Sequence, residues 1–284
     1  MTTDPQLDLG SQDSSSVVSD IVVRRVKFDF PDELDDVFPG DDIVAECYLA
    51  AFSLTMPTLE PYLIRVYRDL GDRITDPALA DDVRQFIAQE AQHHRNHSRV
   101  NSIIKARLGP QVAAELQKIE DDLERDYRRF NAQKSERFNA VYAEGFEAMT
   151  CAMVLASFAR AAAGDGGPAR FGAWQQLFAW HGAEEIEHRT VAFGVYESLV
   201  GSYPYRVYGS LRTQLHFSRY VDRLQRVLLA AHGQPRRPHL PSWLRFGWRQ
   251  YLRTYRYSYD PAEIQPDPLV DIVLAMYAPS PDPS

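Results

Sequence analysis

The chain has 284 residues and a formal net charge of −8 at pH 7, with ordinary globular proportions of 45% hydrophobic and 25% charged residues. A chain of this length buries about three-quarters of the surface that it exposes when unfolded. Its two cysteines, Cys47 and Cys151, exclude a disulfide-rich scaffold and favour a reducing, cytoplasmic compartment. No apolar run approaches the ~18 residues of a membrane span, and the polar start predicts no signal peptide.

The charges are distributed unevenly and divide the chain into four predicted segments. Residues 1–40 form an acidic, partly disordered N-terminal arm, in which residues 21–30 (IVVRRVKFDF) are compatible with an extended conformation. Residues 41–202 are predicted to form the main helical bundle, and from residue 43 onward this segment is nearer to charge balance than the arm. Residues 203–258 form a basic, aromatic helical extension packed on that bundle, and residues 259–284 form an acidic C-terminal tail.

Helical periodicity dominates the chain, and no alternating pattern of useful length indicates a strand. The first helical stretch, residues 43–70, contains Pro57 and Pro61, so we do not expect one straight helix there. A new helix capped near Thr55, with Pro57 in its first turn, would interrupt this stretch. Asp76 and Pro77 provide a cap and a first-position proline for the next helix. The remaining helices are predicted over residues 77–108, 111–131, 134–163, 169–200, 205–232 and 242–257. The fold class is therefore all-α.

Two of these predicted helices carry an ExxH motif. Glu90 and His93 form the first motif, and Glu185 and His188 form the second. At this spacing the two side chains lie on one helix face, about a turn apart, so each pair can reach one metal ion or two adjacent ones. Bundles with a dinuclear carboxylate site combine two such pairs with one glutamate from each of two other helices.

Glu60 and Glu147 are the candidates for the two single glutamates. Glu60 lies ten residues before the end of its helix and Glu90 lies thirteen after the start of the next, which are similar depths, within about 5 Å, in an antiparallel hairpin. Glu147 and Glu185 lie sixteen residues from the ends of their predicted helices, so they also match. Glu144, one turn before Glu147, remains an alternative ligand.

Four buried glutamates would oppose folding unless cations neutralise them. We therefore predict two divalent metal ions, with iron as the first choice and manganese or zinc as alternatives, because the ligands mix oxygen and nitrogen. His181 shares a helix face with the second motif and is predicted as a further ligand, with a hydrogen-bonding role as its alternative, and His97 remains an open candidate ligand. Glu184, Glu187 and His94 are expected to face outward or to support the ligands.

Three segments resemble a known bacterial family. Residues 86–97 (FIAQEAQHHRNH), 180–196 (WHGAEEIEHRTVAFGVY) and 57–60 (PTLE) resemble the family labelled "predicted metal-dependent hydrolase", in the ferritin-like group. The resemblance covers about residues 20–260 and implies a ferritin-like four-helix bundle, extended by C-terminal helices, with a dinuclear metal site. The ligands that it implies are Glu60, Glu90, His93, Glu147, Glu185 and His188. The spacing His181-x3-Glu185-x2-His188 is also similar to the extra-histidine pattern of the di-iron arylamine N-oxygenases.

These features lead to three functional hypotheses. The first is a dinuclear, di-iron enzyme that activates O₂ to oxidise or oxygenate a small organic substrate, with an electron-donor protein as a candidate partner. The second is a metal-dependent hydrolase in which a metal-activated bridging water attacks the substrate. The third is a non-catalytic metal-binding protein. No catalytic residue is predicted beyond the metal ligands.

The basic C-terminal helices favour an internal role. Eleven arginines lie between residues 203 and 256, and we expect their stems to cover the bundle and their charged ends to pair with the acidic arm or tail. Peripheral membrane contact through these helices is the alternative, and binding of nucleic acid is disfavoured. A homodimer remains open.

Overall fold

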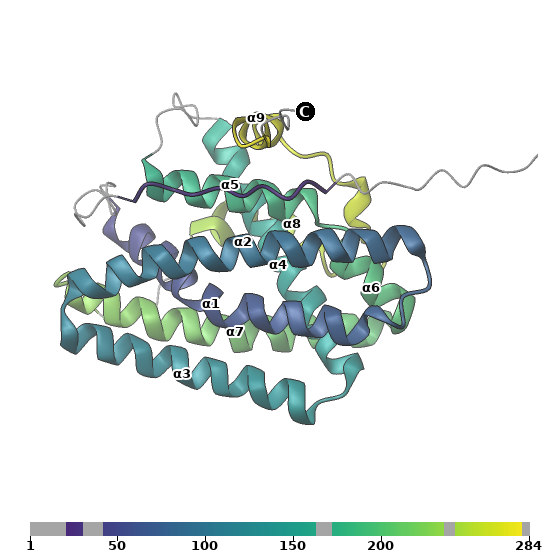
Figure 1. The fold of residues 1–284 in the computed structure, drawn as a ribbon, viewed down its shortest axis with the longest axis horizontal. Coiled ribbons are helices and arrows are strands. Elements are labelled where there is room, and N and C mark those ends of the chain that lie inside the picture. Colours follow the sequence, from purple (N-terminus) through teal and green to yellow (C-terminus); the bar gives the residue numbers. More distant parts are fainter. Residues whose placement is uncertain (1–20, 31–41, 163–171, 236–241, 280–284) are drawn as a thin grey trace, which may run out of the picture.

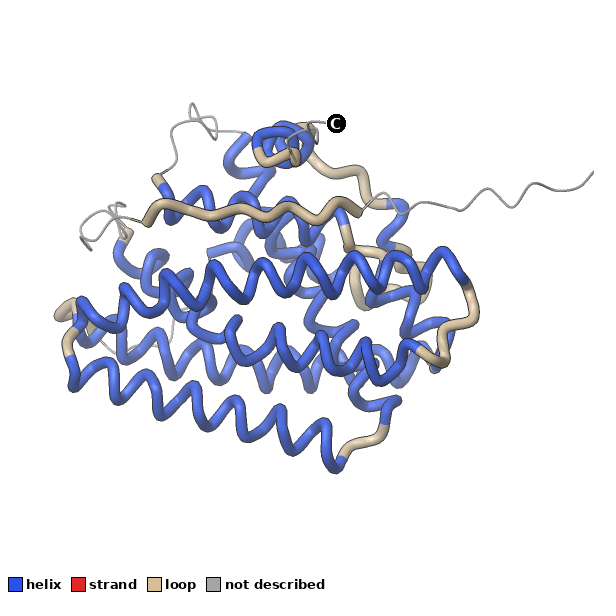
Figure 2. The backbone as a smooth tube through the Cα atoms, in the orientation of Figure 1, coloured by secondary structure: helices blue, strands red, loops and turns tan. Residues whose placement is uncertain are grey.

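The computed structural model describes residues 21–30, 42–162, 172–235 and 242–279. Within these ranges it consists of helices and connecting segments with no strand, which confirms the all-α prediction (Figure 2). None of the described helices combines the length and the apolar character needed to cross a bilayer. Residues 1–20 and 31–40 of the predicted arm lie outside the described ranges, so the partial disorder predicted for it is not tested.

The helices form a bundle in which α1, α2 and α3 pack together and α7 packs on both α1 and α4 (Figure 1). Helix α1 packs on α2, α3 and α7, whereas α4 packs on α5, α6, α7 and α8, and α9 covers α5. The predicted start of the second helix is correct, because the Asp76 side chain accepts a hydrogen bond from the backbone N–H of Ala78. The elements are α1 (Ile43–Gly71), α2 (Pro77–Leu108), α3 (Pro110–Gln133), α4 (Glu136–Ala162), α5 (Ala173–Glu187), α6 (Val191–Leu199), α7 (Tyr203–Ala231), α8 (Ser242–Arg253) and α9 (Leu269–Met276), with a 3₁₀ turn at Pro261–Glu263.

Helix α1 runs through both of its prolines, so the expected interruption is wrong. Pro57 has no N–H to donate to the carbonyl of Ser53, four residues earlier. The side chain of Asn101, on α2, replaces that donor: its Nδ2 donates to the Ser53 oxygen at 2.8 Å. This contact between two helices keeps Ser53 and Glu60 on one continuous helix.

The prediction of a single helix over residues 169–200 is wrong, because the structure has two helices separated by a turn. Helix α5 ends at Glu187, and a turn at residues 188–190 precedes α6. In this turn the Arg189 side chain donates to the carbonyl oxygens of Ile186 and Pro261, at 2.6 and 2.9 Å, which ties the end of α5 to the C-terminal segment. The expected start at Ala169 lies outside the described residues, so the depth match based on it is not tested.

Glycines allow α4 and α7 to cross at very short range. A Cβ atom on Gly145 would lie 2.6 Å from the Cα of Ser210, and one on Gly209 would lie 2.3 Å from the Val141 Cγ2. Both separations are below any that real Cβ atoms adopt. The crossing fixes α7 against the middle of α4, the helix that carries Glu147.

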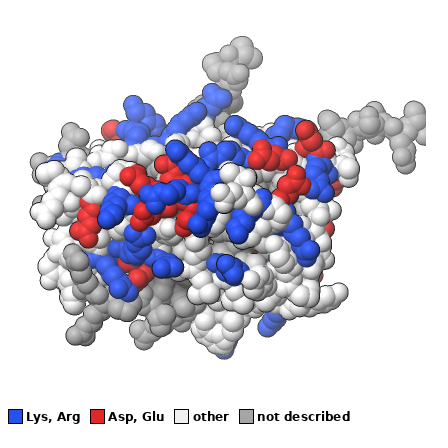
Figure 3. Space-filling model, turned by 90° about the horizontal axis from the view of Figure 1, so that it is seen from below, with Lys and Arg blue, Asp and Glu red and all other residues white. Residues whose placement is uncertain are grey.

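The arginines of the basic region pair with several parts of the fold. Arg223 on α7 contacts Asp122 on α3 at 2.7 Å, and Arg253 on α8 reaches Glu263 of the C-terminal segment at 3.9 Å. On the face seen from below in Figure 3, basic and acidic side chains are interspersed. The expected pairing with the acidic arm is not observed among the described residues, because the described part of the arm lies on other helices.

Residues 21–30, called the N-terminal arm below, are extended and lie along α5 (Figure 1). Ile21, Phe28 and Phe30 are buried, and the Phe28 ring packs 5.5 Å from the ring of Trp180 on α5. The arm also contacts α2, since Asn96 Nδ2 donates to the carbonyl of Val26 at 3.0 Å. The extended conformation expected for this segment is confirmed.

Candidate metal centre

The seven predicted ligands are all buried and converge inside the bundle. None of them exposes more than 5% of its surface. They come from four helices and the turn after α5, and they fall into overlapping groups whose ligand atoms lie within 4.8 Å of one another. The groups are Glu60, Glu90 and His93; Glu90, Glu185 and His188; His93, His181 and Glu185; and Glu60, His97 and His181. Glu147 joins them through its Oε2, 3.5 Å from the His188 Nε2.

Two of the carboxylates lack hydrogen bonds. Both oxygens of Glu60 and the Oε1 of Glu147 are buried without a hydrogen-bond partner among the described residues. Such atoms are rare in folded proteins, because each costs its full desolvation energy. Burial and the charge of Glu90 raise the pKa of Glu60 well above its usual range, and burial and Glu185 do the same for Glu147. As carboxylates, both would be stabilised by a nearby cation.

His188 is held with one nitrogen directed at these acids. Its Nδ1 lies 2.9 Å from the Gln89 Oε1, and Gln89 in turn donates from Nε2 to the carbonyl of Val22 in the N-terminal arm. His188 therefore donates from Nδ1, and its Nε2 faces Glu147 and Glu185, at 3.5 and 3.7 Å. Burial lowers the pKa of His188, but these carboxylates outweigh burial and raise it to about 10. A cation at Nε2 would take the place of that proton.

His93 is held in the same way from another side. Its Nε2 donates to the Glu184 Oε2 at 2.9 Å, and its Nδ1 faces the Glu90 Oε1 at 3.2 Å. The other oxygen of Glu184 accepts from Arg24 at 3.2 Å, and Arg24 is also bonded to Glu187 through both of its terminal nitrogens. Glu184 is fully buried and supports a candidate ligand. Arg24 lies in the arm that the sequence predicts to be extended, but no sequence pattern indicated its contact with Glu184.

His181 is oriented by a chain of hydrogen bonds. Ser53 Oγ donates to the Asn101 Oδ1 at 2.6 Å, so it accepts from the His97 Nδ1 at 2.8 Å. His97 Nε2 then accepts from the His181 Nδ1 at 2.7 Å, which leaves the His181 Nε2 lone pair facing the Glu185 Oε1 at 2.9 Å. Burial and the neighbouring His181 lower the pKa of His97 well below its usual range, so it is neutral. Both nitrogens of His97 are engaged, and the residue orients His181.

Glu147, and not Glu144, is the α4 glutamate that faces the cluster. Glu144 points toward α7, where it accepts from the Ser210 Oγ at 2.9 Å and lies 3.5 Å from the Arg206 Nη1. One turn beyond Glu147, the Thr150 Oγ1 donates to the Glu185 Oε2 at 2.8 Å and fixes that carboxylate. The sequence offered no signal for Thr150 beyond its one-turn spacing from Glu147.

Neither cysteine belongs to the cluster. Cys47 and Cys151 are buried and free, as expected from their number. Burial raises the pKa of both thiols to about 12, so neither is a thiolate at neutral pH. The candidate ligands are therefore oxygen and imidazole nitrogen.

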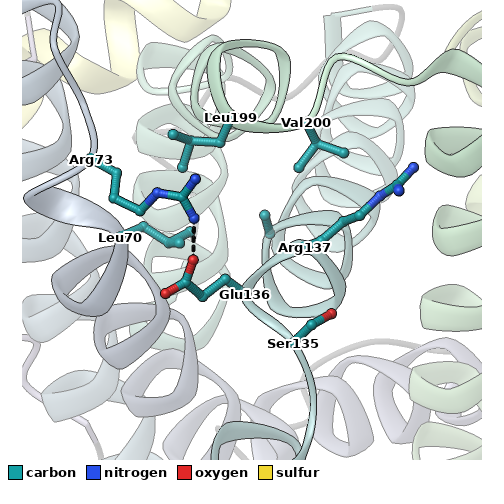
Figure 4. A pocket seen from close by; sticks show the side chains of 8 residues that line it. Leu70, Arg73, Ser135, Glu136, Arg137, Leu199 and Val200 are labelled. Carbon is teal, nitrogen blue, oxygen red and sulfur yellow. Dashed lines mark hydrogen bonds and ion pairs between the residues drawn. The ribbon is translucent and has the colours of Figure 1, made fainter.

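A separate cavity lies near the C-terminal end of α1 and the start of α4 (Figure 4). It has a volume of about 520 Å³, and none of the seven predicted ligands lines it. Arg73 and Glu136 point toward each other across it and form an ion pair, while Arg137 stacks on the ring of Tyr205. Its charged groups have partners within the chain, so the buried cluster is the stronger candidate for a functional site.

A model of the family described as "Predicted metal-dependent hydrolase" matches residues 22–279. The match includes the N-terminal arm from Val22 onward and every helix described above. No curated protein and no solved structure matches the chain significantly. The family match agrees with the resemblance carried by the two ExxH segments. Because the model covers far more than half of its length, the chain belongs to the family of predicted metal-dependent hydrolases.

Proposed function

We propose that this chain is a metal-dependent enzyme whose bundle holds two divalent metal ions in the buried cluster. The observation that carries the proposal is shared by His93, His181 and His188. Each donates its outer N–H to a protein acceptor and directs its inner nitrogen at a buried carboxylate. Histidines that bind metal in proteins are oriented in this way by a hydrogen-bonded partner.

The donor set supports the proposed ions. The four glutamates Glu60, Glu90, Glu147 and Glu185 carry a formal charge that two divalent ions would cancel. Two helices contribute a single glutamate and two contribute an ExxH pair, which is the ligand arrangement of ferritin-like dinuclear carboxylate proteins. Mixed oxygen and nitrogen donors suit iron, manganese or zinc.

The first candidate reaction is hydrolysis, which agrees with the family description "Predicted metal-dependent hydrolase". When bound, divalent ions supply Lewis acidity and a water of lowered pKa, or, if they are iron, electrons for O₂. The chain itself contributes position and exclusion of water. Thr150 holds the Glu185 carboxylate, Gln89 and Glu184 hold two of the histidines, and the ligands expose almost no surface.

Oxidation of an organic substrate by O₂ is the second candidate. The observation in its favour is the ligand pattern itself, because ferritin-like bundles with two glutamates and two ExxH pairs are typical of di-iron and di-manganese proteins. His181, as a third histidine, adds a nitrogen donor beyond that basic set. An electron-donor protein would then be a required partner, whereas the hydrolase needs none.

Metal analysis of the purified protein tests the proposal. We expect about two metal ions per chain and a large loss in the double variant Glu90→Ala with His188→Ala. Glu120→Gln is a matched control. Glu120 is a buried glutamate on α3 that pairs with Lys105 on α2 and does not belong to the cluster. A protein that binds no metal, or a double variant that keeps all of it, would overturn the proposal.

The identity of the metal separates the two reactions. Iron with a visible absorption band that changes on reduction and exposure to O₂ supports oxidation. Zinc or manganese, together with cleavage of model esters, amides or phosphate esters, supports hydrolysis.

A further inference from the structure

An apolar pocket of about 300 Å³ opens between α1, α4, α5 and α9. Its walls include Leu49, Met153, Val154, Phe158 and Phe178, and no Asp, Glu, Lys or Arg is among the described residues that line it. By contrast, arginines line the cavity near the end of α1 and the start of α4, and another cavity on α3 and α7. The volume lies at the lower end of the range for small-molecule sites, roughly 300–1,000 Å³.

Phe178 is the wall shared by the pocket and the metal centre. It lines the pocket from α5, and its ring lies 5.6 Å from the ring of His97, edge to face. His97 is bonded directly to His181, one of the candidate ligands. Only one aromatic ring therefore separates the pocket from the hydrogen-bonded histidines.

The pocket walls on α1 and α4 lie near residues that hydrogen-bond the cluster. Leu49 lies one helical turn before Ser53, the residue that bonds His97. Val154 lies one turn after Thr150, the residue that bonds Glu185. A turn of helix rises about 5.4 Å, so on α1 and α4 the pocket begins about one turn from residues that hydrogen-bond His97 and Glu185. On α5, Phe178 lies about one turn before His181 itself.

We propose that this pocket binds the apolar aliphatic or aromatic part of a small-molecule substrate whose reactive end lies at the metal centre; this rests on the proposed function above. The small, concave and uncharged shape fits a hydrocarbon body and excludes a phosphate or carboxylate from the pocket itself. Burial of apolar surface would supply the binding energy. The polar part of the substrate is thereby directed past Phe178 toward His97 and His181.

The test uses N-phenyl-1-naphthylamine, a neutral fluorescent hydrocarbon amine, with the full chain. We expect saturable binding with one site per chain. Ala179→Phe places a ring inside the pocket, and probe affinity should fall at least about tenfold because the space is filled. Ala159→Phe, at an exposed position of α4 that does not line the pocket, is the matched control and should bind as the wild type does. Absence of saturable binding, or equal binding by Ala179→Phe, would overturn the proposal.

A second measurement tests the distance to the centre. Trifluoromethylbenzene is added to protein loaded with either Mn²⁺ or Zn²⁺, and the relaxation of its fluorine nuclei is compared. Faster relaxation with Mn²⁺, lost in Ala179→Phe, supports a pocket beside the metal. Equal relaxation with both ions, when both are bound, overturns the proposal. If the wild type takes up neither ion, the proposed function is refuted. A pocket that still binds the fluorescent probe would then be a binding site without the proposed role in substrate binding.

Discussion

Substitution of Glu184 by glutamine tests the orientation of His93 with a change of one functional group. In the wild type both carboxylate oxygens accept hydrogen bonds, Oε1 from Arg24 at 3.2 Å and Oε2 from the His93 Nε2 at 2.9 Å. A glutamine side chain offers one acceptor oxygen and one NH₂ donor. One of the two donors, on Arg24 or on His93, must then face another donor inside a fully buried site.

The expected loss follows from that conflict. Loss of the hydrogen-bond partner of a histidine ligand lowers metal affinity by about 10- to 100-fold, equivalent to roughly 1.4–2.7 kcal/mol. A buried donor without an acceptor also lowers the free energy of unfolding by about 1–3 kcal/mol. The affinity of the Glu184→Gln variant is measured by competition with a chromophoric chelator, with Glu120→Gln as the control. Metal affinity within a factor of two of the wild type would refute the assigned role of Glu184.

Three further predictions concern packing, pH and the N-terminal arm. Gly145→Ala should lower the free energy of unfolding by about 1–3 kcal/mol in urea, because the added Cβ clashes with α7, whereas Gly71→Ala meets no atom within 4 Å and should change it little. Burial raises the pKa of Glu144 from about 4.5 to about 7. Between these pH values the Glu144 carboxyl group is protonated in the folded state and ionised in the unfolded state. The free energy of unfolding therefore falls as the pH rises through this range. Relative to the wild type, Glu144→Gln should therefore gain up to roughly 3 kcal/mol between pH 5 and pH 8 in urea unfolding, and parallel pH curves would contradict this. Arg24→Met should speed chymotryptic cleavage within residues 21–30, because Arg24 is buried against two glutamates, whereas the exposed neighbour Arg25→Met should not; equal rates would refute the anchoring role.

The convergence of the candidate ligands could be predicted because it depends on helical spacing. The pairs Glu90–His93 and Glu185–His188 need only the i, i+3 geometry of one helix, and the structure brings both pairs together as expected. The choice between Glu144 and Glu147 could not be made in this way, since both lie on adjacent positions of one face. It depends on Arg206 and Ser210 of α7, which are remote in sequence.

The features that sequence reasoning missed all depend on contacts between distant segments. Pro57 was expected to interrupt α1 because the sequence does not show that Asn101 satisfies the carbonyl it leaves unpaired. The turn after Glu187 is tied by Arg189 to Pro261, more than seventy residues away. Neither contact can be predicted from local helix propensity. The first accompanies the continuity of α1 through Pro57, and the second lies at the turn that ends α5.

The docking of the N-terminal arm is linked by hydrogen bonds to the proposed metal centre. Val22 and Arg24 hold Gln89 and Glu184, which in turn hold two of the histidines. Coupling between two binding events is reciprocal, so whatever factor the docked arm adds to metal affinity, bound metal adds to the docking of the arm. Loss of metal would therefore release residues 21–30 from the bundle more often. The rate at which a protease cuts these residues would then report the fraction of protein that holds metal, without any direct measurement of the metal.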